Sequence, residues 1–130
     1  MAVGVLLIAH PAFGKAVLEA AQHINGINSL TVVAHDIQPG LDGTAQLISA
    51  SASFRKVDNP AGVLILVDGP GGIADKTAAQ LAQFGTPTRR VSGLSLPMLL
   101  RVMHYAEQDL DELARTAAAG GRNGVVIDHA

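Results

Sequence analysis

A histidine and an aspartate stand directly after two apolar runs of this chain. Residues 3–9 lead straight into His10, and residues 62–67 lead into Asp68. Such continuous aliphatic runs are typical of strands buried on both faces of a parallel sheet. The carboxyl ends of parallel strands meet at one edge of the sheet, where open α/β proteins bind ligands. If the two strands are neighbours, about 4.8 Å apart, the two side chains are predicted to lie within reach of one another.

An imidazole paired with a carboxylate suits nucleophilic chemistry. Imidazole is partly neutral near pH 7, and a carboxylate on one ring nitrogen leaves the other with a lone pair for attack. The amides of Phe13 and Gly14, near a helix start, would favour an anion. Further amides are expected from a phosphate-binding loop that contains Gly69, Gly71, Gly72 and Ile73. These parts predict a phosphoryl group carried on His10, with His10 and Asp68 as catalytic residues.

The same residues allow a purely structural interpretation. A histidine at a strand end is often part-buried for packing alone. Asp68 could cap the following turn, and Gly71 and Gly72 could serve only to permit a positive φ. The placement of His10 and Asp68 at equivalent strand ends favours the functional interpretation.

The remaining chain alternates between strand and helix patterns. Predicted strands cover residues 2–9, 30–34, 62–67 and 88–94. Predicted helices cover residues 15–24, 44–54, 74–84, 97–103 and 109–119. The crossovers are long enough for parallel pairing. The sequence therefore predicts one doubly wound α/β domain, residues 1–130, with a mainly parallel sheet of four strands and helices on both faces. Gly120 and Gly121 are expected to end the last helix, and residues 125–127 could add a C-terminal edge strand.

Composition excludes several classes of function. Aromatic residues make up only 3% of the chain and apolar residues 48%, so the core must be aliphatic. A net charge of −2 gives no basic surface for nucleic acid. With no cysteine and no histidine pair at i, i+4, neither a metal nor another cofactor is expected. No apolar stretch approaches the roughly 20 residues that cross a bilayer, so we expect a cytoplasmic protein without direct membrane insertion.

The segment after Asp68 has some features of a P-loop, because it continues into Lys76 and Thr77. However, Asp75 occupies the position of the glycine before the lysine, and Pro70 that of the first glycine. A carboxylate pointing into a phosphate cradle would repel the ligand. ATP binding is therefore not expected, and no Gly-x-Gly-x-x-Gly follows the first strand to suggest a dinucleotide site.

Three motifs in this order resemble a known family over nearly the whole chain. They are His10 after the first apolar run, Asp68 with Gly71 and Gly72, and Gly-Leu-Ser-Leu-Pro-Met-Leu at residues 93–99. Together they are similar to the IIA component of the mannose-family sugar phosphotransferase system. The resemblance implies that His10 accepts a phosphoryl group on Nε2 from HPr and passes it to a IIB partner, while Asp68 binds the opposite nitrogen. It also implies a homodimer formed through the C-terminal strand.

The chain departs from the family pattern at three positions. Pro11 replaces a glycine, Ile73 replaces a serine or threonine, and Ser95 replaces an asparagine. Pro11 removes an amide and Ile73 removes a hydroxyl, so we expect weaker contacts to the phosphoryl group.

Phosphoryl transfer between proteins requires a shallow apolar surface on which two partners dock in turn. The residues expected to form it are Pro11, Phe13, Pro70, Ile73 and Met98. Two alternatives stay open within this fold. One is a regulatory phosphohistidine module that controls another protein. The other is the phosphotransfer subunit of a dihydroxyacetone kinase, which also uses a histidine at the end of its first strand.

Overall fold

The computed structural model describes residues 2–26 and 29–128. Its strands and helices, in chain order, are β1 (Gly4–Ala9), α1 (Phe13–Asn25), β2 (Val32–Asp36), α2 (Gly43–Arg55), β3 (Val63–Val67), α3 (Ile73–Leu81), β4 (Thr88–Ser92), α4 (Leu96–His104) and α5 (Leu110–Asn123). The strands form one sheet in the order β2-β1-β3-β4, and every neighbouring pair is parallel. The predicted doubly wound α/β fold with four parallel strands is confirmed.

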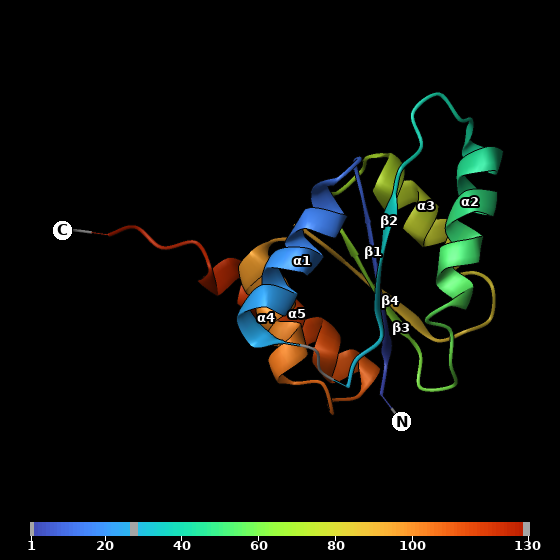
Figure 1. Cartoon of the computed structure of the whole chain (residues 1–130). Coiled ribbons are helices and arrows are strands. Elements are labelled where there is room, and N and C mark those ends of the chain that lie inside the picture. The colour runs from blue at the N-terminus through green and yellow to red at the C-terminus, as the bar shows by residue number, and fades with distance from the viewer. Residues whose placement is uncertain (1, 27–28, 129–130) are drawn as a thin grey trace.

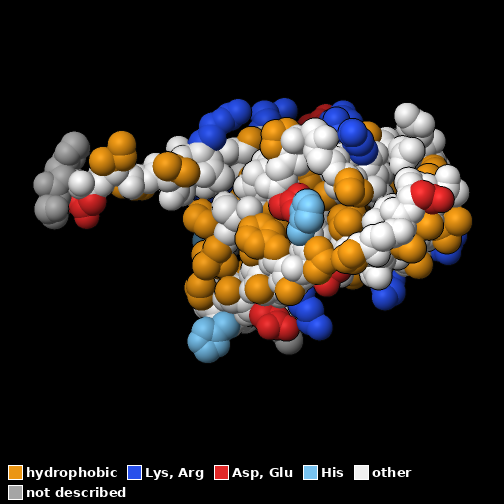
Figure 2. Space-filling model, turned by 90° about the horizontal axis from the view of Figure 1, so that it is seen from above, with side chains coloured by type: hydrophobic (Ala, Val, Ile, Leu, Met, Phe, Trp, Pro, Cys, Tyr) orange, Lys and Arg blue, Asp and Glu red, His pale blue; other side chains and the backbone are white. Residues whose placement is uncertain are grey.

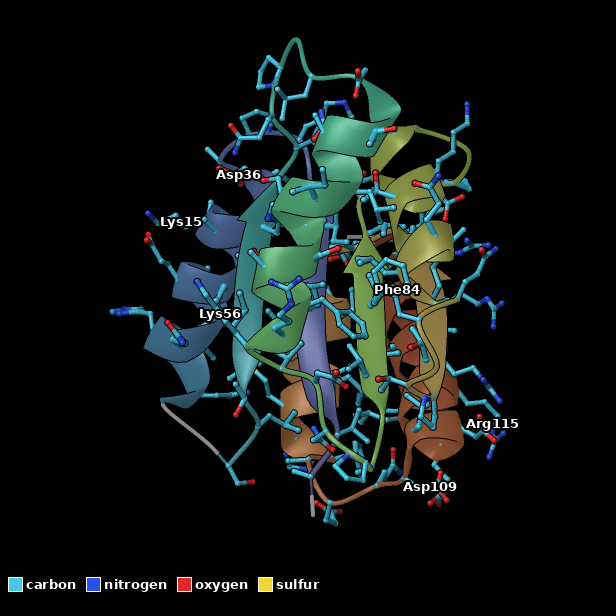
Figure 3. All side chains as sticks on the ribbon, turned by 90° about the vertical axis from the view of Figure 1, so that its right-hand side faces the viewer. Lys15, Asp36, Lys56, Phe84, Asp109 and Arg115 are labelled. Atoms are coloured by element: carbon cyan, nitrogen blue, oxygen red, sulfur yellow. The ribbon has the colours of Figure 1, made fainter. Side chains whose placement is uncertain are left out.

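Helices cover both faces of the sheet (Figure 1). Helices α1, α4 and α5 pack on one face, and α2 and α3 pack on the other. Figure 3 looks onto the second layer, with α2 and α3 in front of the strands. Within β1, Val5 and Leu7 contact the first layer, while Leu6 and Ile8 contact the second. Each residue of β1 and β3 is buried, which explains why the two runs are apolar without alternation.

The two edge strands are more polar than the central pair. Strand β4 carries the exposed residues Arg89 and Arg90, and all residues of β2 except His35 are only partly buried. The second strand was predicted to end at residue 34, but it extends through His35 to Asp36. His35 is buried, and its Nδ1 lies 2.9 Å from the Ser53 hydroxyl of α2. This contact satisfies Nδ1, whereas Nε2 of His35 is buried without a hydrogen-bond partner among the described residues.

The prediction that Gly120 and Gly121 end the last helix was wrong, because α5 continues to Asn123. Both glycines lie against α4. A Cβ atom on Gly120 would stand 2.8 Å from the Cβ of Arg101, and one on Gly121 would stand 2.9 Å from the Cε of Met98. The missing side chains thus allow the two helices to approach closely, which outweighs the low helix propensity of glycine.

Residues 125–127 do not form a strand in this structure. Val125, Val126 and Ile127 are 82%, 78% and 84% exposed. In Figure 1 the segment leaves the end of α5 and runs away from the sheet. Strand β4 consequently keeps an unpaired edge among the residues that the structure describes.

Candidate functional site

The fold brings His10 and Asp68 to the same edge of the sheet. Strands β1 and β3 are direct neighbours, and the last pair in their register is Ile8 with Val67. His10 lies two residues after Ile8, and Asp68 directly follows Val67. The predicted proximity of His10 and Asp68 is thereby confirmed, and it follows from the parallel pairing of two central strands.

Asp68 contacts His10 twice through one oxygen. Asp68 Oδ2 accepts a hydrogen bond from the His10 backbone amide at 2.9 Å and lies 2.6 Å from His10 Nδ1. An ionised carboxylate can only accept, so Nδ1 must carry the proton of this contact. In the neutral ring the lone pair then resides on Nε2. The His10 side chain is 66% exposed and that of Asp68 only 21% exposed, so the ring is accessible while its carboxylate partner is shielded.

The electrostatics of the site favour an ionised Asp68. Burial of the carboxyl raises its pKa, but several contacts oppose this effect. The hydrogen bonds from the ring and backbone of His10, the charge of that ring and the hydrogen bond from the Gly69 amide together hold the pKa of Asp68 below its ordinary value. The carboxylate is thus available to stabilise positive charge on the imidazole.

A tight turn joins His10 to α1. The His10 carbonyl accepts a hydrogen bond from the Phe13 amide at 3.1 Å, with Pro11 and Ala12 between them. Ala12 has φ of 69°, and it is the one non-glycine residue with positive φ in the described ranges. The Phe13 amide is occupied by this turn, so it does not serve as the predicted anion donor. Gly14 has no hydrogen-bond acceptor for its amide in the part of the chain that the structure describes.

The glycine loop is already partly bonded by carboxylates. The Gly69 amide donates to Asp68 Oδ1 at 3.0 Å, and the Gly71 amide donates to Asp75 Oδ2 at 2.7 Å. Gly71 has φ of 79°, a conformation that favours glycine. The amides of Gly72 and Ile73 donate no hydrogen bond to any of the described residues. Of the predicted loop donors, only these last two are therefore available to a bound anion.

The predicted docking residues divide into an exposed group and a buried one. Phe13 and Ile73 are 42% and 50% exposed, and Pro11 and Pro70 are exposed as well. Figure 2 looks onto this edge and shows a histidine against an acidic side chain, bordered by hydrophobic side chains. Met98 is only 2% exposed and belongs to the core beneath α4. It is therefore not part of an exposed docking surface, because the apolar face of α4 turns toward the sheet.

Asp75 is the site residue whose role sequence reasoning missed. It was considered only as an obstacle to a P-loop, yet its carboxylate holds the Gly71 amide. Asp75 is the third residue of α3, and Gly72 is the N-cap. An acidic residue three positions after an N-cap is a known signal for a carboxylate that bonds amides at the helix start. That signal was present in the sequence.

The described residues contain neither a metal-binding cluster nor a membrane-spanning helix. No group of three or more His, Asp or Glu side chains is arranged to hold a metal ion there. None of the helices in that part of the chain is both long and apolar enough to span a bilayer.

The chain matches known proteins over most of its length. Residues 4–118 match the family model EIIA-man, described as PTS system fructose IIA component. The mannose-specific EIIAB component of the PTS system from Escherichia coli (strain K12) is 27% identical over 127 residues, which is 96% of this chain. The chain spans only 39% of the length of that relative.

Solved structures agree with this match. The mannose/sorbose specific IIA subunit from Enterococcus faecalis has a TM-score of 0.83 and 25% identity, with 100% of this chain and 97% of that chain covered. Component EIIA from Streptococcus agalactiae has a TM-score of 0.82 at 22% identity, with 96% of each chain covered, and shows the shared fold.

The family match and the fold place the chain among the IIA components of the phosphotransferase system, which are phosphotransferases in general. Within that class, the chain belongs to the EIIA-man family. Membership implies a role as a phosphoryl carrier and confirms the family resemblance of the sequence motifs.

Proposed function

We propose that Nε2 of His10 accepts a phosphoryl group from the phosphohistidine of HPr and passes it to a IIB partner. The observation that carries the proposal is the contact of Asp68 with Nδ1, which leaves an exposed Nε2 lone pair. Nε2 attacks phosphorus and forms the new N–P bond while the N–P bond of the donor breaks, and the donor imidazole keeps that electron pair. The proton on Nδ1 stays in place, and the ionised Asp68 stabilises the resulting positive ring.

Two free amides in the loop that follows Asp68 support this chemistry. Gly72 and Ile73 have no hydrogen-bond acceptor for their amides in the described ranges, and they stand at the start of α3. Two adjacent amides at a helix N-terminus are suited to phosphoryl oxygens. In the proposed intermediate they would replace the side-chain hydroxyl that Ile73 cannot supply.

Partner docking is proposed on the exposed apolar ring around His10, formed by Pro11, Phe13, Pro70 and Ile73. An open surface fits a carrier that must meet two proteins in turn, because a deep pocket would exclude both. The proposed relay places the chain in the cytoplasm with HPr and IIB as partners.

We also propose that the chain forms a homodimer through residues 125–127. These three apolar residues are exposed, and β4 has an unpaired edge among the described residues. An open strand edge and an exposed apolar segment are complementary, since pairing forms hydrogen bonds between the backbones of both and buries the apolar side chains of the segment.

Phosphorylation by the purified relay tests the main proposal. The chain is incubated with phosphoenolpyruvate, enzyme I and HPr, and its intact mass is measured for wild type, His10→Ala and His23→Ala. His23 is an exposed histidine on α1 and serves as the matched control. We expect one acid-labile phosphoryl group on wild type and His23→Ala, and none on His10→Ala. Phosphate on a histidine of His10→Ala would contradict the assignment.

Addition of a mannose-type IIB protein then tests the acceptor. Loss of the label from His10 with its appearance on IIB supports the relay. A stable phosphohistidine that no IIB protein discharges would instead favour the regulatory module.

A further inference from the structure

A carboxylate outside the reacting pair binds the glycine loop beside His10. Asp75 Oδ2 accepts the Gly71 amide at 2.7 Å, the shorter of the two carboxylate contacts to this loop. The loop consists mainly of glycine, with Pro70 its one residue that carries a side chain between Asp68 and Ile73. Since glycine has the greatest backbone freedom, the loop needs external contacts to hold one conformation.

Asp75 is itself held by a cation from the neighbouring strand. Arg90 of β4 places Nε 3.0 Å from Asp75 Oδ1, and its Nη1 donates to the Asp75 carbonyl at 3.4 Å. Oδ1 is buried, and the Arg90 ion pair, although not aligned as a hydrogen bond, is the contact that compensates its charge. The Asp75 side chain is 16% exposed and that of Arg90 is 40% exposed. The carboxylate is therefore largely shielded from solvent, while the guanidinium reaches the surface.

The two carboxylates divide the loop amides between them. Asp68 accepts a hydrogen bond from the Gly69 amide, and Asp75 accepts one from the Gly71 amide. The amides of Gly72 and Ile73 remain available to a ligand. A carboxylate near a phosphoryl group would ordinarily weaken binding by repulsion. Arg90 offsets that repulsion, because it neutralises Asp75 without contacting the loop amides.

We propose that Asp75, balanced by Arg90, is a positioning residue for phosphoryl transfer at His10. It fixes the glycine loop so that the Gly72 and Ile73 amides meet the transferred group. The inference rests on the proposed function, and it adds a residue pair that acts through the loop. Its effect should fall on the transfer step and not on the docking of HPr, since neither side chain belongs to the apolar ring of Pro11, Phe13, Pro70 and Ile73.

The experiment compares Asp75→Ala with Asp75→Asn in single-turnover phosphorylation by phospho-HPr. Alanine removes the acceptor for the Gly71 amide, and we expect the rate at saturating HPr to fall roughly tenfold or more. The half-saturating HPr concentration should stay unchanged. Asparagine keeps an acceptor oxygen, so Asp75→Asn should recover most of the rate. Thermal unfolding of both variants verifies that each is folded.

The charge balance is tested through Arg90. Arg90→Gln leaves Asp75 without its cation and should slow transfer, whereas the double variant Asp75→Asn with Arg90→Gln should be no slower than Asp75→Asn alone. Such non-additivity is the signature of a directly coupled pair. The matched control is Arg89→Gln, which changes the neighbouring arginine of β4 and breaks its ion pair with Asp111 of α5. That variant should stay within about twofold of wild type.

Amide hydrogen exchange of residues 69–73 provides a readout that does not depend on phosphate. The Gly71 amide should exchange faster in Asp75→Ala than in wild type or Asp75→Asn. The inference would be overturned if a folded Asp75→Ala transferred the phosphoryl group at the wild-type rate and its Gly71 amide exchanged as in wild type. If the wild type itself takes no phosphate from charged HPr, the proposed function fails and the role of Asp75 in transfer fails with it. Exchange then decides separately whether Asp75 orders the loop.

Discussion

One oxygen atom of Asp68 orients both the backbone and the ring of His10. Oδ2 lies 2.9 Å from the His10 amide nitrogen and 2.6 Å from Nδ1. The imidazole is two-thirds exposed, so packing contributes little to its orientation. The carboxylate therefore sets both the position of the ring and the nitrogen that faces solvent.

Replacement of Asp68 by asparagine should slow phosphorylation while the fold persists. Asparagine is nearly isosteric, but its neutral amide cannot stabilise positive charge on the ring. Since a hydrogen bond to a charged group contributes about 1.5–3 kcal/mol, we expect a rate loss of roughly 10- to 100-fold. The measurement is single-turnover transfer from phospho-HPr. Asp58→Asn, which alters a carboxylate that accepts a hydrogen bond from Thr86, is the control and should transfer at the wild-type rate.

The same substitution should change the acid sensitivity of the fold. Because the pKa of Asp68 is lowered from 3.8 in the folded chain, the unfolded chain binds this proton more readily. The stabilisation by ionised Asp68 is fully present above pH 3.8 and is lost as the pH falls through the lower folded pKa. Urea unfolding of wild type and Asp68→Asn, from about pH 5 to 3, should show the steeper loss of stability in wild type. Equal slopes would contradict this assignment.

The central strands and the contact between His10 and Asp68 were predictable because they depend on local patterns. A run buried on both faces is apolar throughout, and parallel strands bring the residues that follow them to one edge. The contact of His10 with Asp68 then follows from the adjacency of β1 and β3. The prediction of this contact required only that both apolar runs form central, neighbouring strands.

Features that depend on tertiary packing were not predictable in the same way. Gly120 and Gly121 carry a helix-ending signal, and only the approach of α4 explains why the helix continues. Met98 follows a proline at a helix start, and nothing in the local sequence says that it faces the sheet. The pairing of Asp75 with Arg90 joins residues on two elements, so it could not be read from either element alone.

Ala12→Gly should stabilise the protein. An L-residue in the left-handed region is disfavoured by about 1–2 kcal/mol, and glycine removes that strain at φ of 69°. Part of the gain is offset by the larger entropy of glycine in the unfolded chain, about 0.5–1 kcal/mol. We expect a net increase in the free energy of unfolding of about 0.5–1 kcal/mol, measured by urea denaturation.

Ala16→Gly is the matched control for that substitution. Ala16 is an exposed residue within α1, where glycine costs roughly 0.5–1 kcal/mol. The two alanine-to-glycine changes, four residues apart in the sequence, should thus have opposite signs. If both substitutions lowered the free energy of unfolding, the positive φ of Ala12 would not be a source of strain that glycine relieves.

His35 should make the fold less stable below neutral pH. Burial lowers the pKa of His35 from 6.5; the charge of Asp36 raises it and that of Lys56 lowers it further. A folded pKa below the unfolded one means that stability is complete above pH 6.5 and declines as the pH falls below it. His35→Gln removes the titrating group. Its unfolding free energy should therefore change less between about pH 7.5 and 5.5 than that of wild type.

A second histidine variant isolates the effect of burial. His23 is exposed on α1, so His23→Gln should keep the wild-type dependence of stability on pH. If His35→Gln and wild type lost stability in parallel over this range, the decline would have to come from other groups.

Deletion of residues 125–130 should convert the proposed dimer into a monomer. If residues 125–127 pair with the β4 edge of a second copy, the deletion removes the interface, and Val126→Asp should weaken it by placing a charge among buried apolar groups. Light scattering coupled to gel filtration measures the mass over a range of concentrations. Ile48→Asp, at a 68% exposed apolar residue on α2, is the matched control and should remain dimeric. A wild-type chain that is monomeric at every concentration, or a deletion variant that still dimerises, would show that these residues do not form the interface.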